Sequence, residues 1–192
     1  MPVPIALPLF PTYNELKRVD FLEYPQLHAL LNQQPDWFNK HWLWAQEFLL
    51  YIGRNKSEHT FSRFRNEVER FLLWTFLIKE KSLDELRKSD ILEYADFCWQ
   101  PPVSWICLAS YEKFIPQAGV YIPNKQWAPF RLKLAKGDSD VKPDKNNYRP
   151  SQQTLTASFT AIIAFYKYLM NEEYCAGNPA QIAKKDCRYF IK

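Results

Sequence analysis

The feature that most constrains the fold is a long apolar stripe at helical spacing. Five large apolar residues recur at i, i+3, i+7, i+10 and i+11, and they are Phe61, Phe64, Val68, Phe71 and Leu72. Successive residues of an α-helix turn by about 100° around its axis, so this spacing gathers the five side chains on one face. We therefore predict an amphipathic helix that is capped by Ser57 or Lys56 and buries this face.

A second long helix is predicted from Ser151 to about Glu172. Pro150 and Ser151 suit a helix N-terminus, because proline and serine are favoured in the first positions. The segment Gly177–Pro179 is expected to end the helical region. The apolar stripe of this helix comprises Leu155, Phe159, Ile162, Tyr166 and Leu169.

The other segments indicate how the chain is organised. Shorter helical patterns run from Asp36 to Gly53, where glycine is expected to end the helix, and from Ile91 to Cys98. We predict an all-α bundle of four to five helices. We expect three parts: an N-terminal arm (1–35) that lies against the main body, a helical domain (36–180) and a closing segment (181–192). The helical domain contains a long aromatic and Pro-rich insertion (99–149), and a polar loop (136–150) leads from it to the second long helix.

The composition agrees with a packed protein that has stiff loops. Hydrophobic residues make up 47% of the chain and aromatic residues 17%, so a core can form. Fourteen prolines stand against four glycines. The net charge of +4 and the pI near 8.8 only slightly favour a polyanionic partner, so the position of the charges matters more.

The sequence gives no sign of a metal, a cofactor or a membrane segment. The four cysteines form no CxxC pair, and with only three histidines there is no zinc-ligand spacing, so we expect reduced thiols. The N-terminus lacks the basic cluster of a signal peptide. No apolar run approaches the roughly 20 residues that span a bilayer. We therefore expect a cytoplasmic protein without cofactors.

No pattern in the sequence supports catalysis. The chain has no Gly-rich phosphate loop, no GxSxG motif and no distinct Cys–His pair. Paired carboxylates such as Glu172–Glu173 lie at helix ends, where they typically serve as caps or compensate the helix dipole. We therefore expect no catalytic residues in this chain.

The exposed faces of the two long helices carry residue types that contact DNA. Arg, Lys, Ser and Thr bind phosphates, and Arg, Asn and Gln reach base edges. The candidates at the first helix are Lys56, Ser57, His59, Thr60, Arg63 and Arg70. The candidates at the second helix are Ser151, Gln152, Gln153, Thr156, Thr160 and Lys167.

These faces are also compatible with roles that involve no DNA. A basic helix face is usually only solvated, and Glu67 and Glu69 dilute the positive charge of the first helix. The small residues Ala157 and Ala164 of the second helix could instead pack against another helix. The residues alone therefore leave open a DNA-binding module and a helical module for protein interaction or oligomerisation.

Several short motifs follow one another in a characteristic order. Ser57-x-x-Thr60 opens a helix that ends in Phe71-Leu-Leu-Trp74, and Lys81-Ser-Leu83 precedes Leu86-x-x-x-Asp90-Ile91-x-x-Tyr94. The last motifs are Ser151-x-x-Thr154-Leu155, Phe159-x-x-Ile162-x-x-Phe165-Tyr166-x-Tyr168-Leu169 and Asn178-Pro179. In order and spacing they resemble the core-binding (SAM-like) domain of tyrosine recombinases, the phage integrase family.

This resemblance implies that helices over 57–78 and 151–170 lie against double-stranded DNA and form one half of a C-shaped clamp. It also implies that 181–192 begins a linker to a catalytic domain, and that full-length protomers assemble with one another. The family's His-x-x-Arg motif is missing here, because no histidine has an arginine three residues later. The chain itself is therefore not expected to exchange DNA strands.

Overall fold

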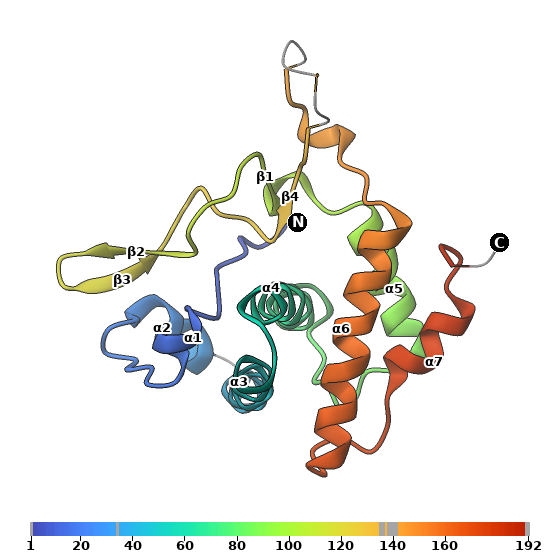
Figure 1. Cartoon of the computed structure of the whole chain (residues 1–192), viewed down its shortest axis with the longest axis horizontal. Helices are drawn as coiled ribbons and strands as arrows, with labels where there is room; N and C mark the ends of the chain where they lie inside the picture. The colour runs from blue at the N-terminus through green and yellow to red at the C-terminus, as the bar shows by residue number, and fades with distance from the viewer. Residues whose placement is uncertain (1, 34, 135–136, 138–141, 191–192) are drawn as a thin grey trace.

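The computed structural model describes residues 2–33, 35–134, 137 and 142–190. Within these residues the protein is mostly helical, with seven α-helices and two small two-stranded sheets (Figure 1). The prediction of a mainly helical fold is confirmed, but the prediction that it is purely α-helical is wrong. All four strands lie in the insertion between α5 and α6.

The centre of the molecule consists of α3 (Trp37–Asn55), α4 (Glu58–Trp74), α5 (Lys88–Trp99) and α6 (Gln152–Asn171). Helices α3 and α4 pack side by side, and both are seen nearly end-on in Figure 1, whereas α6 is seen lengthwise. Helix α6 therefore crosses the α3–α4 pair at a steep angle. The apolar stripes of α4 and α6 meet in one hydrophobic core.

Both long helices are capped by serines, α6 by the predicted Ser151 and α4 by Ser57, one of its two predicted caps. Ser57 and Ser151 have extended backbone conformations, and each hydroxyl oxygen accepts a hydrogen bond from the backbone N–H three residues later. The distances are 3.2 Å to Thr60 N and 3.1 Å to Thr154 N. Each Ser-x-x-Thr motif is therefore an N-cap, which satisfies one of the free N–H groups of the first helical turn.

Gly53 does not end α3 as predicted, because the helix continues to Asn55. A β-carbon at Gly53 would lie 2.4 Å from the ring carbons of Tyr13. Tyr13 belongs to the short helix α1 (Tyr13–Leu16), which packs on α3. The glycine thus allows close approach of two elements and does not act as a helix stop.

The N-terminal segment joins the main core. It contains α1 and α2 (Pro25–Gln33), and the side chains of Leu9, Phe10 and Leu16 are fully buried. Trp42 on α3 donates a hydrogen bond from Nε1 to the Leu9 carbonyl at 2.8 Å. The arm therefore lies against the helical body and contributes side chains to its interior.

The insertion forms strands because its sequence suits extended structure. Strand β2 (Phe114–Gln117) pairs antiparallel with β3 (Val120–Pro123), from Phe114 opposite Pro123 to Gln117 opposite Val120. The turn between them is Ala118–Gly119, and both residues have positive φ, as two-residue hairpins prefer. Aromatic and β-branched residues in β3 favour a strand. This hairpin extends over α1 and α2 (Figure 1).

The rest of the insertion is anchored near the N-terminus. After a 3₁₀ turn (Val103–Trp105), strand β1 (Ile106–Cys107) pairs in parallel with β4 (Phe130–Arg131). Trp105 is fully buried and donates from Nε1 to the Pro4 carbonyl at 2.9 Å. The predicted polar loop 136–150 falls partly outside the described residues, and its described part includes a 3₁₀ turn (Lys145–Asn147).

The C-terminal segment stays packed on the helical body. Helix α7 (Pro179–Asp186) is capped by Asn178 and contacts α5 and α6. Its Ala180 and Ala183 are fully buried. The segment 181–192, expected as the start of a linker, therefore begins inside a packed helix. Among the described helices, none is both long and apolar enough to cross a membrane.

Candidate nucleic-acid interface

The first predicted face lies at the N-terminal half of α4. Lys56, His59 and Arg63 are exposed, and Thr60 is half-buried. Ser57 is also exposed, with its hydroxyl used in the helix cap. One turn of helix beyond this point the surface changes, because the insertion covers the second half of α4. The described face is therefore shorter than the sequence predicted.

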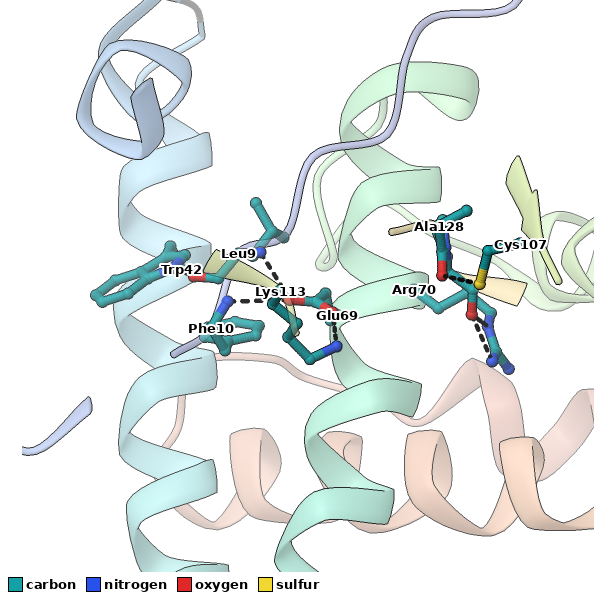
Figure 2. Close-up of polar contacts among 9 residues, drawn as sticks. Leu9, Phe10, Trp42, Glu69, Arg70, Cys107, Lys113 and Ala128 are labelled. Atoms are coloured by element: carbon teal, nitrogen blue, oxygen red, sulfur yellow. Dashed lines mark hydrogen bonds and ion pairs between the residues drawn. The ribbon is translucent and has the colours of Figure 1, made fainter. Parts of the chain in front are cut away.

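Arg70 does not lie on this exposed face, which corrects the sequence-based assignment. Its side chain is only 12% exposed, and Nη1 donates to Glu67 Oε2 at 3.0 Å. Nε and Nη2 both donate to the Pro129 carbonyl, and the guanidinium lies 4.4 Å from the centre of the Phe130 ring. Arg70 thus holds the insertion on α4 (Figure 2). Burial opposes its charge, but Glu67 together with Tyr94, Cys98 and Tyr148 outweighs burial, so the pKa of Arg70 is raised.

Two of the three acidic residues of α4, Glu67 and Glu69, are buried and neutralised. Glu67 pairs with Arg70, and Glu69, whose side chain is 1% exposed, pairs with Lys113 at 2.6 Å. Oε2 of Glu69 also accepts hydrogen bonds from the backbone N–H groups of Leu9 and Phe10 (Figure 2). Their negative charges therefore do not dilute the positive charge of the exposed half of α4, contrary to the expectation from helical periodicity.

The second predicted face follows α6. Gln153, Thr160 and Lys167 are exposed, and Thr156 is half-buried. The hydroxyls of Thr156 and Thr160 donate to carbonyls one turn earlier, at 2.9 and 2.8 Å, so their oxygens can only accept further hydrogen bonds. The twenty residues of α6 include no Asp or Glu. This face is therefore polar and without negative charge.

The remaining α6 candidates have structural contacts. Ser151 is exposed, but its hydroxyl is engaged in the helix cap. The side chain of Gln152 is also exposed and donates from Nε2 to the Tyr189 carbonyl at 2.9 Å. Gln152 therefore ties the start of α6 to the C-terminal segment, which leaves its carbonyl oxygen and second amide hydrogen for other hydrogen bonds.

A groove of about 1160 Å³ separates α4 from the insertion and from the start of α6. Of the predicted site residues, Arg63, Arg70 and Ser151 line this groove. The other predicted residues lie outside its lining. The cationic side chains of the lining are Arg63, Arg65, Arg70, Lys113, Arg131, Lys133 and Arg149, and the acidic ones are Glu15, Glu67, Glu69 and Glu112.

Sequence reasoning missed most of these groove cations. Arg131, Lys133 and Arg149 belong to the insertion. The only feature of the sequence that could have pointed to them as site residues is that basic residues recur in this segment. Arg65 sits on the flank of α4, and its Nε is buried with no hydrogen-bond partner among the described residues. Burial lowers the pKa of Arg65, and the nearby Glu69 offsets part of this effect. Burial likewise lowers the pKa of Lys113, whose ammonium faces Glu69.

The described residues offer no metal site, since no cluster of three or more His, Cys, Asp or Glu side chains occurs among them. All four cysteines are buried free thiols. Cys107 lies at 3.4 Å from the carbonyl oxygens of Ala109 and Phe130, which places it in the support of the insertion.

Comparisons with protein-family models, with curated proteins and with solved structures found no significant match to this chain.

Proposed function

We propose that this chain is a DNA-binding module that grips double-stranded DNA with α4 and α6, in the manner of the core-binding domain of a tyrosine recombinase. In this proposal α3, α4, α5 and α6 correspond to the SAM-like bundle. The order of sequence motifs supports the family assignment. The observation that carries the DNA-binding function is the burial and pairing of both acidic residues in the middle of α4.

The charge of a DNA duplex limits which protein faces can contact it. A duplex is a dense row of negative charges, so a protein face that contacts it must be positive or at least free of carboxylates. Glu67 and Glu69 each have a cation at 3.0 Å or less, and a paired buried charge has little field at the surface. The exposed half of α4 then carries Arg63, with Lys56 just before the helix, against Glu58 alone. Helix α6 carries Lys167 without an acidic residue of its own.

The individual residues have distinct roles in this proposal. Lys56, His59, Arg63 and Lys167 would contact phosphates, with Ser57 and Thr60 adding hydrogen bonds at the start of α4. The exposed amide of Gln153 can both donate to and accept from base edges in a major groove. Thr156 and Thr160 would contribute oxygen acceptors and let the α6 backbone approach the duplex. Strand exchange is not assigned to these residues.

Duplex binding can be tested by fluorescence anisotropy with a blunt-ended DNA hairpin, whose loop is a non-nucleotide linker, over a range of salt concentrations. The variant Arg63→Ala with Lys167→Ala should bind more weakly at every salt concentration. Each phosphate contact adds about 0.9 to the slope of log affinity against log salt, so losing two should reduce the slope by about 1.8. The matched control is Lys17→Ala with Lys40→Ala, since both lysines are exposed and lie outside α4, α6 and the groove.

The proposal predicts that the control variant binds like the original protein. It is wrong if the original protein does not bind duplex DNA at low salt, or if both double variants lose affinity equally. A salt-insensitive oligomer without DNA binding would instead favour the alternative, a helical interaction module.

A further inference from the structure

The groove between α4 and the insertion has a positive charge that the fold itself does not use. Of its four carboxylates, three are engaged by cations: Glu15 by Arg18, Glu67 by Arg70 and Glu69 by Lys113. Only Glu112 remains to oppose five other groove cations. These five have no carboxylate partner among the described residues, and they are Arg63, Arg65, Arg131, Lys133 and Arg149.

Arg65 shows this excess most directly. Its Nε is buried yet has no acceptor among the described residues, although a buried N–H normally has one. Its guanidinium lies 5.9 Å from the centre of the Phe61 ring, which offers only a weak interaction. Arg149 donates only to backbone carbonyls, those of Tyr148 and Asn146, among the described residues. An anion in the groove would supply the acceptors that these side chains lack.

The groove also presents aromatic rings. Tyr111, Tyr121 and Trp127 line it and are half-buried, so part of each ring remains accessible. Trp127 is held in place by the Lys113 ammonium, 4.6 Å from its ring centre, and Tyr121 by stacking on Tyr24 at 5.1 Å. Fixed rings beside a row of cations are the two elements that bind single-stranded nucleic acid, through base stacking and phosphate contacts.

The volume of the groove suits a single strand better than a duplex. Its volume of about 1160 Å³ is close to that of a pocket for one small molecule, which favours a narrow, flexible segment. We propose that this groove is a second nucleic-acid site, which binds a short segment of single-stranded DNA with phosphates on Arg131 and Arg149 and a base against Trp127. The site goes beyond the proposed duplex face, with Arg63 lying where the two meet.

The test measures binding of an oligothymidylate of about a dozen nucleotides, in parallel with the blunt-ended hairpin used for the duplex face. The variant Arg131→Gln with Arg149→Gln should weaken oligothymidylate binding at least tenfold. It should also lower the salt slope by about 1.4, because each phosphate contact to a single strand contributes about 0.7. Both arginines are exposed, so the variant should fold, which its melting curve checks. The control Lys17→Gln with Lys40→Gln should change neither quantity.

A stacking variant separates base contacts from charge. Trp127→Leu should weaken oligothymidylate binding about fivefold or more while leaving the salt slope unchanged, since stacking neutralises no phosphate. The hairpin should bind both groove variants as it binds the original protein.

Three results would overturn the single-strand site: oligothymidylate binding that the arginine variant leaves intact, an equal loss for the lysine control, or displacement of oligothymidylate by polyglutamate of matched charge. If the hairpin fails to bind but oligothymidylate binds in an arginine-dependent way, the duplex proposal fails and the groove proposal stands.

Discussion

Glu69 links both the N-terminal arm and the insertion to α4. One carboxylate oxygen accepts hydrogen bonds from the backbone N–H groups of Leu9 and Phe10, at 2.7 and 3.0 Å. The other oxygen accepts a hydrogen bond from the Lys113 ammonium at 2.6 Å (Figure 2). The variant Glu69→Gln keeps one carbonyl oxygen for the two backbone donors, but it places an amide N–H₂ against a buried ammonium.

The expected loss follows from that geometry. Glu69 and Lys113 have side chains that are only 1% and 9% exposed, so removing the carboxylate leaves a nearly buried positive charge. Breaking a buried ion pair from one side costs about 3–5 kcal/mol of the free energy of unfolding. Because a domain is stable by only about 5–15 kcal/mol, the variant should be severely destabilised but can still fold.

The pH dependence of this loss has a definite sign. Burial already lowers the pKa of Lys113, and the substitution removes the carboxylate that partly offsets burial. In the variant the folded-state pKa of Lys113 therefore falls further below its unfolded value. The folded state then binds fewer protons than the unfolded state, so the penalty should be largest at neutral pH and should shrink as the pH rises towards 10 or so.

Guanidinium denaturation followed by the fluorescence of the tryptophans would measure these changes by linear extrapolation. Adding Lys113→Met to Glu69→Gln should recover most of the lost stability, because the double variant buries no charge. Glu112→Gln is the matched control, since this neighbouring carboxylate is exposed and should matter by less than about 0.5 kcal/mol. A loss below about 1 kcal/mol for Glu69→Gln, or no recovery in the double variant, would show that the buried pair does not hold these segments.

Two further predictions concern the helical core. Burial lowers the pKa of His41 to about 4 from its usual 6.5, so the unfolded chain binds a proton between these values that the folded chain does not. Stability should therefore fall by roughly 3 kcal/mol as the pH drops from 6.5 to 4, and His41→Gln should remove this part of the pH dependence in urea titrations. Gly53→Ala should cost about 1–3 kcal/mol in the same assay, because its β-carbon would meet the Tyr13 ring. Gly177→Ala, with no atom within 4 Å of its β-carbon, should change stability by less than about 0.5 kcal/mol, and an equal cost at both glycines would contradict the role of the Tyr13 contact.

The local features of the chain were predictable because they depend on neighbouring residues. The apolar stripe from Phe61 to Leu72 predicted α4, and Ser151 and the pair Lys56–Ser57 marked where the two long helices start. Helix period and N-capping are decided within a few residues, so one sequence is sufficient to recognise them. The exposure of Arg63 and Lys167 followed from the same periodicity.

The insertion could not be placed in this way. It covers the second half of α4. Arg70, which was expected to be exposed, is therefore buried and donates a hydrogen bond to the Pro129 carbonyl. The insertion also supplied Lys113, the partner that neutralises Glu69 from 44 positions further along the chain. Helical periodicity tells which residues share a face, but it does not tell which distant segment covers that face.

The order of residues was therefore sufficient to predict a mainly helical protein and the exposed polar side chains of two of its helices. Which charges on those faces remain available depends on the folded molecule. A carboxylate on an exposed helix repels a polyanion, whereas the same carboxylate buried against an ammonium does not, because the nearby opposite charge cancels its field. That difference arises from contacts between residues far apart in the sequence, such as Glu69 with Lys113 and Arg70 with Pro129.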